Sequence, residues 1–433
     1  MLYLLDRDIL DNIISLIKDN INILLISKEI YELTIKYKII LLDFNENTNS
    51  ISKNLLKKNY KNVFVQSYNI EDIININTVT NKFLDNYITH LYLPNYNYKN
   101  IELLKSINMN FSFLSKLHTL KLYTEINTSM IFPDNLHTLI LHYHNSNIFN
   151  LNTQENTYKL FNNLPKNLHT LNLYGYNNFV DNLPKNLHKL ILCGSFNKSI
   201  NNLPENLHIL KLHGHFNQNI DYLPKNLKIL EISGNFNKSI NNLPKNLHTL
   251  KLLCNFNQNI DNLPKNIHTL ILSSDFNQII DKLPIKLYKL QLGNTFNQNI
   301  DNLPKDLHTL ILGSNFNKNI DNLPKHLYKL ILGYNFNKPL NKLPPNLHTL
   351  QIGSKFNQSI NDLPYNLHKL ILYSSLKQSI NNLPKKLYEL TLRSNYFQYI
   401  VNLPPNLHIL RLPKIYSNKN IPLYLQDKII YYD

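Results

Sequence analysis

Residues 256–275 read FNQNIDNLPKNIHTLILSSD, and near copies of this stretch follow one another through most of a chain of 433 residues. The Leu-Pro step at its centre returns every twenty residues without an insertion. The leucines of these steps are Leu183, Leu203, Leu223, Leu243, Leu263, Leu283, Leu303, Leu323, Leu343, Leu363, Leu383 and Leu403. A fixed period of this length predicts a solenoid, in which each repeat forms one coil that stacks on the preceding coil.

Each coil carries a strand motif and a return segment. In the motif IHTLIL, Leu270 and Leu272 alternate with variable residues, which is the period of a strand with one buried face. Because every coil runs in the same direction, the strands are predicted to form a parallel sheet. The return segment contains Pro264 and is too short for a regular helix, so we expect extended structure. Phe256 and Ile260 should point inward against the two leucines.

The composition limits the class of protein. The chain is 43% hydrophobic and carries a formal charge of +16. Cys193 and Cys254 lie three coils apart, too far for a disulfide, which favours a reducing compartment. No apolar stretch approaches the ~18 residues of a membrane span, and Asp6 and Asp8 interrupt the N-terminus where a signal peptide needs apolar residues. We expect an intracellular protein that does not contact a membrane.

Asparagine and glycine recur at the turns. An asparagine follows the phenylalanine of most coils: Asn177, Asn197, Asn217, Asn237, Asn257, Asn277, Asn297, Asn317, Asn337 and Asn357. Since an asparagine side chain has two donors and an acceptor, a stacked column is predicted to satisfy backbone groups from coil to coil. All eight glycines follow the strand motifs closely and are predicted to be turn residues with unusual φ.

Histidine occupies the second position of most strand motifs. These residues are His118, His137, His169, His188, His208, His248, His268, His308, His348, His368 and His408. Tyr288, Tyr328, Tyr388 and Lys228 take the same place in other coils, and neither Tyr nor Lys would replace a metal ligand. A column of stacked rings about 4.8 Å apart is therefore expected instead.

Repeated carboxylates do not form a catalytic pair. Asp221, Asp261, Asp281, Asp301 and Asp321 alternate with asparagine at one turn position, so a charge is dispensable there. No phosphate-binding glycine motif occurs. The sequence predicts no enzyme activity, no cofactor, no metal and no small-molecule substrate.

The order Phe-Asn, Ile, Leu-Pro and L-x-x-L-x-L resembles the FNIP repeat, a relative of the leucine-rich repeat that is expanded in slime moulds and giant DNA viruses. The resemblance covers residues 176–412 strongly and 88–175 weakly, where spacing is irregular. It implies an α+β, mostly β fold, a leucine-rich-repeat-like solenoid with one short parallel strand per coil, preceded by a small helical segment. We assign residues 41–87 to a connecting region and 413–433 to a C-terminal cap.

Residues 1–40 resemble an F-box. The residues that fit its pattern are Leu5, Asp8, Ile9, Leu10, Ile13, Ile14, Leu16, Ile26, Ser27, Lys28 and Tyr31. Asp6 stands where the family usually has proline. The resemblance implies that the first seven dock on a Skp-family linker and thence a cullin scaffold. The solenoid would then select a target for ubiquitination, in the cytoplasm of the cell or of a host.

A simpler interpretation of this N-terminal segment stays open. Its apolar residues recur at helical spacing, so it is also consistent with a helical cap over the first coil. In that case the chain would be a repeat scaffold or decoy with no ubiquitin-ligase role.

Variable strand positions predict the partner-binding surface. The residues that point away from the core differ from coil to coil, and those chosen as a binding face are Thr269, Ile271, Gln291, Thr309, Ile311, Ile331, Gln351 and Ile371. Solenoids commonly bind partners on such a sheet. Exposed isoleucine is costly on an unused surface, although it also has high β-propensity.

Nucleic acid is the alternative partner. Lys185, Lys225, Lys245, Lys265, Lys305, Lys325 and Lys385 follow the prolines and should form a row. Glu205, Ile285, Pro345, Tyr365 and Pro405 break that row, and it lacks interleaved aromatic residues. An AT-rich coding sequence would also make lysine the default surface residue. The sequence therefore favours a protein partner.

Overall fold

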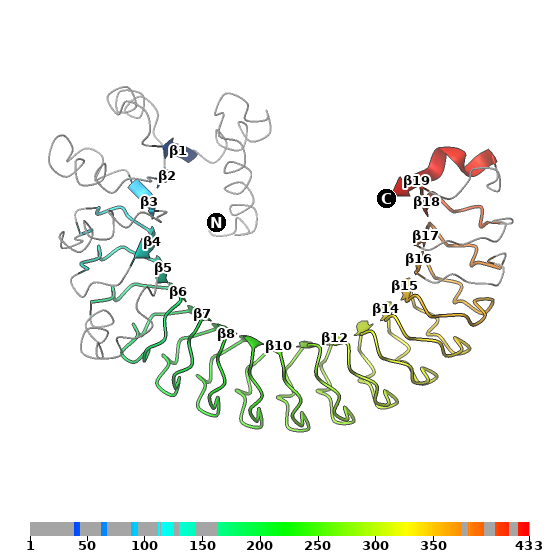
Figure 1. The fold of residues 1–433 in the computed structure, drawn as a ribbon, viewed down its shortest axis with the longest axis horizontal. Helices are drawn as coiled ribbons and strands as arrows, with labels where there is room; N and C mark the ends of the chain where they lie inside the picture. Colours follow the sequence, from blue (N-terminus) through cyan, green and yellow to red (C-terminus); the bar gives the residue numbers. More distant parts are fainter. Residues whose placement is uncertain are drawn as a thin grey trace. The chain divides into compact units, whose positions relative to one another are not determined.

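The computed structural model describes residues 39–43, 62–66, 88–93, 111–112, 114–124, 130–143, 163–373, 380, 382–393, 403–414 and 423–432. The helices predicted within residues 1–40 lie outside these ranges. The chain divides into two compact units, Met1–Leu171 and Asn172–Asp433. Figure 1 shows the ribbon coloured along the sequence.

The first unit is a stack of parallel strands. Its strands are β1 (Ile39–Asp43), β2 (Asn62–Gln66), β3 (Ile88–Leu93), β4 (Thr119–Thr124) and β5 (Thr138–Tyr143). Each pairs in parallel with the next, with a register irregularity at Val63 and Phe64. The sequence motifs predicted coils only from about residue 88, so β2 and most of β1 extend the stack into the region expected to be a connection. Ile39 and Ile40 of β1 belong to the segment 1–40 that was expected to be helical, and they are in a strand instead.

The second unit contains the regular coils. After β6 (Thr170–Tyr174), which spans the division between the units, its strands are β7 (Lys189–Gly194), β8 (Ile209–Gly214), β9 (Ile229–Gly234), β10 (Thr249–Cys254), β11 (Thr269–Leu272), β12 (Lys289–Leu292), β13 (Thr309–Leu312), β14 (Lys329–Leu332), β15 (Thr349–Ile352), β16 (Lys369–Leu372), β17 (Glu389–Leu392), β18 (Ile409–Pro413) and β19 (Ile429–Tyr432). The 3-10 helix η4 (Leu423–Lys428) precedes β19.

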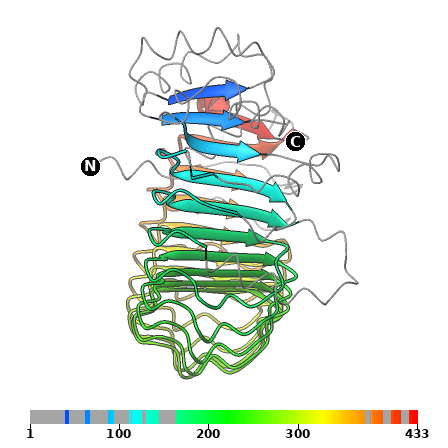
Figure 2. The ribbon, with the colours of Figure 1, turned by 90° about the vertical axis from the view of Figure 1, so that its left-hand side faces the viewer.

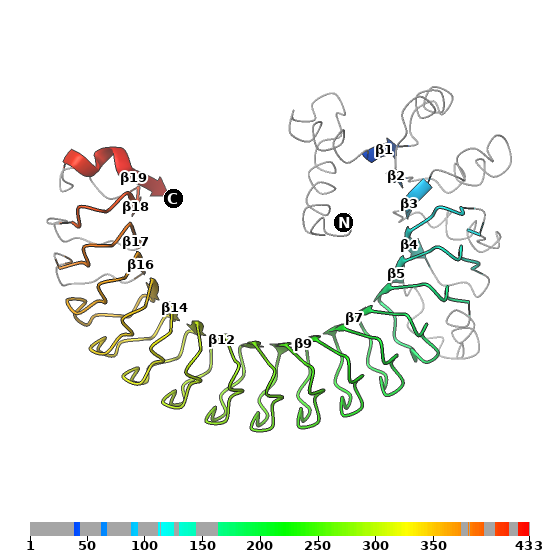
Figure 3. The ribbon, with the colours of Figure 1, turned by 180° about the vertical axis from the view of Figure 1, so that it is seen from behind.

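The strands of the second unit form one parallel ladder. Each strand from β7 to β18 pairs with the next one in the sequence, in a register that shifts by twenty residues per coil up to β18. Figure 2 shows strands of this ladder from the side, all pointing the same way. Within this unit the strands line the concave side of the curve, and the return segments line the convex side (Figures 1 and 3). The predicted parallel solenoid of about twenty residues per coil is confirmed.

The core lies between the strands and the return segments. Leu270 and Leu272 are at most 1% exposed, and Phe256 and Ile260 close the coil from the other side, at 1% and 2%. The phenylalanines from Phe196 to Phe356 stack ring on ring with centroids 6.0–6.2 Å apart. Where the structure describes them, the return segments contain turns and no regular helix, as Pro264 and its equivalents predicted.

The predicted asparagine ladder is also present. The backbone N–H of each asparagine donates to the side-chain Oδ1 of the asparagine one coil earlier, at 2.9–3.1 Å, from Asn177 to Asn357. In several coils the next residue adds a second donor, as Gln298 does to Asn277 at 3.2 Å. The ladder thus supplies acceptors to turn amides that the sheet does not reach.

Glycine serves two different purposes. Gly214, at the end of a six-residue strand, has φ of +103°, which a residue with a side chain rarely adopts. Gly313 follows a four-residue strand and its φ lies outside the left-handed region, but an added Cβ would come within 2.2 Å of the Gly293 carbonyl oxygen. The expectation of unusual φ at all eight glycines is therefore wrong for Gly293, Gly313, Gly333 and Gly353, where close packing of neighbouring coils excludes a side chain.

We predict that Asn277→Ala lowers the free energy of unfolding by about 1–3 kcal/mol, because it removes the Oδ1 that accepts from the Asn297 N–H and the Gln298 amide. The exposed Lys265→Ala, on the same repeat array, should change it by less than about 0.5 kcal/mol. Denaturant unfolding monitored by circular dichroism compares the two variants. Equal stability of both would show that water replaces the ladder at no cost.

Candidate binding face

The residues predicted to bind a partner lie on one surface. We use the name strand face for the outward side of β11 to β16, which is formed by the first and third residue of each four-residue strand. All eight predicted residues are on it and are half-buried, while the second and fourth residues of each strand form the core. The structure brings the eight together in two columns; their role in binding stays a prediction.

The two columns have different chemistry. In the first, threonine and lysine alternate, since Thr269 pairs with Lys289 and Lys289 with Thr309 in the strand register. In the second column, every position is either isoleucine or glutamine. Two isoleucines are neighbours where Ile311 pairs with Ile331. The isoleucines were expected to be exposed, but they are half-buried because side chains of the adjacent coils cover their flanks. The free-energy cost of exposing this face to water without a partner is therefore smaller than the sequence suggested.

A column of rings borders the strand face. Tyr288, His308, Tyr328, His348 and His368 stack successively with centroids 4.4–4.8 Å apart, which confirms the predicted aromatic column. Burial, and then the neighbouring His368, lowers the pKa of His348, so this imidazole is neutral at pH 7. The two tyrosines remain open to solvent, at 51% and 39% exposed.

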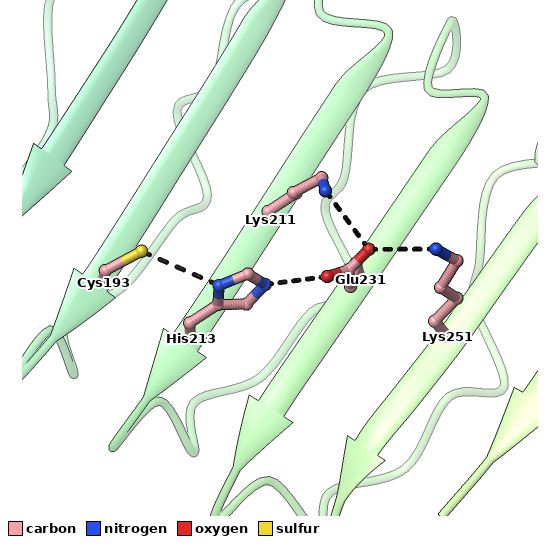
Figure 4. Close-up of polar contacts among 5 residues, drawn as sticks. All are labelled: Cys193, Lys211, His213, Glu231 and Lys251. Carbon is pink, nitrogen blue, oxygen red and sulfur yellow. Dashed lines mark hydrogen bonds and ion pairs between the residues drawn. The ribbon is translucent and has the colours of Figure 1, made fainter. Parts of the chain in front are cut away.

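A buried carboxylate organises the neighbouring strands β8 to β10. Glu231 is only 8% exposed. Its Oε2 lies 3.4 Å from Lys211 Nζ and 3.3 Å from Lys251 Nζ, and its Oε1 lies 3.0 Å from His213 Nε2 (Figure 4). Burial alone would raise the pKa of Glu231, but the charges and hydrogen bonds of the two lysines outweigh it and hold the pKa below its ordinary value. The carboxylate is therefore ionised and fully paired.

Cys193 extends this cluster. Its Sγ lies 3.7 Å from His213 Nδ1 (Figure 4). Because a carboxylate only accepts hydrogen bonds, His213 donates to Glu231 through Nε2–H, and in the tautomer with its single ring proton on Nε2 the Nδ1 atom is an acceptor for the thiol. Burial raises the pKa of Cys193 to about 11 even with Lys211 nearby. The thiol is thus protonated at neutral pH and is not an activated nucleophile.

A second carboxylate is paired in the same way at the other end of the strand face. Glu389 Oε2 lies 2.9 Å from Lys369 Nζ, and its Oε1 lies 3.2 Å from Arg411 Nε. Each carboxylate on these columns is therefore held between two cations from the strands on either side. Between them, Lys289 and Lys329 form no ion pair with any residue that the structure describes.

The sequence analysis missed the Glu231 cluster. The signal was available, because Lys211, Glu231 and Lys251 occupy the third strand position of consecutive coils and alternate in charge at intervals of twenty residues. The solenoid places such positions side by side. The outward positions that predicted the binding face begin at β11, and from there no carboxylate occurs until Glu389.

The remaining sequence predictions concern the linker-docking residues, membrane spans, metal sites and the two cysteines. The linker-docking residues Leu5, Asp8, Ile9, Leu10, Ile13, Ile14 and Leu16 lie outside the described residues. Over the ranges that the structure does describe, no helix is long and apolar enough to cross a membrane. Over the same ranges, histidine, cysteine and carboxylate side chains form no group of three that could hold a metal ion. Cys193 and Cys254 are both free thiols.

The coil geometry and the outward strand face define a leucine-rich-repeat-like solenoid protein. The family model described as FNIP Repeat matches residues 216–255, 256–295, 296–335 and 316–355, and each match spans two coils. Residues 216–355 thus carry FNIP repeats, and this finding supports the resemblance over the central coils. No curated protein matches the chain.

A solved structure confirms the solenoid fold. The circular leucine-rich-repeat protein CroV588 is similar, with a TM-score of 0.61 and 25% identity, over 92% of this chain. The match spans 60% of the length of CroV588. YopM from Yersinia enterocolitica also matches, with a TM-score of 0.46 and 21% identity, over 75% of this chain and 66% of YopM.

We predict that Glu231→Gln destabilises the second unit by about 1–3 kcal/mol at pH 7, because two lysines and a histidine lose their ionised partner. The folded-state pKa of Glu231 is depressed, so its stabilisation is fully present above the ordinary value of 4.5 and is lost as the pH falls through the folded-state pKa. The difference between wild type and variant should therefore shrink below about pH 4.5.

Denaturant unfolding at a series of pH values measures this difference. The control is Asp275→Asn, which removes an exposed carboxylate that forms no ion pair among the described residues. Asp275→Asn should leave the free energy of unfolding nearly unchanged at every pH in the series. A Glu231→Gln effect that is constant from pH 7 to the acid range would mean that the loss comes from packing rather than from the charge.

Proposed function

We propose that this protein is a protein-protein interaction adaptor whose strand face binds a target protein. The observation that carries the proposal is the division of each strand into constant inward leucines and variable outward residues. Inward positions fix the stack, so outward positions are free to differ without altering the fold. The strand face also combines half-buried isoleucines with a solvent-exposed border of tyrosine rings, which suits protein contacts.

The proposal assigns no catalytic role. Histidine exchanges with tyrosine in the ring column, and aspartate exchanges with asparagine at the turns. Among the described residues, the thiol–imidazole–carboxylate arrangement at Cys193 holds a protonated thiol and a carboxylate that is paired with two lysines. These features support an adaptor rather than an enzyme.

The second half of the proposal concerns delivery. The F-box-like pattern from Leu5 to Leu16 supports docking on a Skp-family linker, which would make the protein a substrate-recognition subunit of a cullin-based ubiquitin ligase. This half rests on the sequence alone. The alternative is a scaffold or decoy that binds partners without delivering them to ubiquitin.

We predict that the full chain binds a purified Skp-family linker and that changing Ile9, Ile13 and Leu16 to Asp abolishes this binding, because the apolar docking side would be lost. Calorimetry or a pull-down with purified components measures it. The variant must unfold at the same denaturant concentration as the wild type, which shows that the solenoid is intact. No binding by the wild type would leave the scaffold or decoy function.

We predict that Ile311→Arg combined with Ile331→Arg removes most of the proteins captured from a cell extract by the wild type, because two long cations disrupt the centre of the strand face. The matched control is Ile279→Arg, which changes a residue that is 61% exposed on a return segment. Quantitative mass spectrometry compares the captured proteins. If Ile279→Arg reduces capture as much as the double variant does, the partners do not bind on the strand face.

A further inference from the structure

Uncompensated positive charge is concentrated at the centre of the strand face. Glu231 is paired with Lys211 and Lys251, and Glu389 with Lys369 and Arg411. Between these two clusters, the outward positions of β11 to β15 include two ionised residues, Lys289 and Lys329, and no carboxylate. Since neither lysine has an ion pair among the described residues, a bound partner can supply the missing charges.

The spacing of the two lysines is set by the sheet. Lys289 pairs in register with Thr309, and Thr309 pairs with Lys329. Two steps of about 4.8 Å place their backbones about 10 Å apart. In an α-helix, residues seven apart are separated by about 10.5 Å along the axis and return to the same face. In an extended strand, residues of one face repeat at about 6.6 and 13 Å, which fits the lysines less well.

The surroundings of the lysines suit an amphipathic helix. Ile311 and Ile331 are half-buried in the adjacent column, and the rings of Tyr288 and Tyr328 stand exposed at the border. A four-residue strand spans about 13 Å, similar to the diameter of about 10–12 Å of a helix with its side chains. At the far end of these three strands, Gly293, Gly313 and Gly333 contribute no side chain.

We propose that β12 to β14 bind an acidic amphipathic helix of a partner protein. The helix lies along the stacking direction, with carboxylates seven residues apart on Lys289 and Lys329 and an apolar stripe on Ile311, Ile331 and the two tyrosines. This inference rests on the proposed function and names the chemistry of the partner. A nucleic acid fits less well, because two lysines among aliphatic side chains give a polyanion few contacts and no row of stacking platforms.

The direct test uses a synthetic helical peptide of about 20 residues with glutamate at every seventh position and leucines three and four residues after each glutamate. Comparison probes are the same peptide with a central proline, a version with lysine in place of glutamate, and a single-stranded thymidine oligonucleotide. Fluorescence anisotropy at physiological ionic strength measures binding of each probe to the full chain. Only the acidic helical peptide should bind with appreciable affinity.

Matched protein variants locate the binding. Lys289→Glu with Lys329→Glu changes the net charge by the same amount as Lys265→Glu with Lys305→Glu, which alters two exposed lysines on the edge formed by the return segments. The first pair should weaken peptide binding at least tenfold, and the second less than about threefold, as expected for screened long-range charge. Both variants should keep the circular dichroism spectrum of the wild type.

Several results would overturn the inference. Equal losses in both variants, equal binding of the proline-containing peptide, tighter binding of the oligonucleotide, or no binding of the acidic peptide would each contradict an acidic helical partner. The proposed function fails separately. If Ile311→Arg with Ile331→Arg still abolishes capture of partners while the peptide does not bind, the strand face is a protein-binding surface whose partner has different chemistry.

Discussion

The parallel backbone hydrogen bonds between successive coils fix the distance at which each residue of a strand meets its own repeat copy. The bonds from His308 N to Tyr288 O and from Tyr328 N to His308 O, both 2.9 Å, are typical of the array. A side chain that recurs on or beside the strands must therefore tolerate a copy of itself about 4.8 Å away. Planar rings stack at this distance, asparagines donate to one another, and leucines pack. The phenylalanines across the coil meet their copies at 6.0–6.2 Å between ring centroids. These are the residues that the repeat keeps constant.

Charged residues obey the same constraint in a different way. Like charges in adjacent strands are destabilising, whereas opposite charges attract. Lysine alternates with threonine at Lys289, Thr309 and Lys329, which keeps cations two coils apart. Lys211 and Lys251 are likewise two coils apart in their column, and there a carboxylate, Glu231, stands between them in place of a threonine. The charge pattern of the face thus follows from the spacing of the coils, and it leaves unpaired lysines only where no carboxylate intervenes.

The sequence predicted what repetition determines. The period, the strand positions, the buried Phe256 and Leu270, the asparagine ladder and the ring column each follow from one coil copied many times. It predicted less well where copies differ. β1 lacks a Leu-Pro step in its coil, and the two roles of glycine depend on whether a strand has six residues, as at Gly214, or four, as at Gly313. The Glu231 cluster can be predicted only if the residues at one strand position are compared across three consecutive coils.

The half-burial of the outward isoleucines affects how the face can bind. A side chain that neighbouring coils already cover loses less water-exposed area on binding than a free one, so each isoleucine contributes less than its size suggests. Specificity then depends more on the exposed rings of Tyr288 and Tyr328 and on the charges of the unpaired lysines beside them. Because these residues recur at every second coil, recognition along the array is spaced by two coils. One pair of coils is therefore the smallest unit that presents one tyrosine ring with one unpaired lysine, although the sequence itself repeats with every coil.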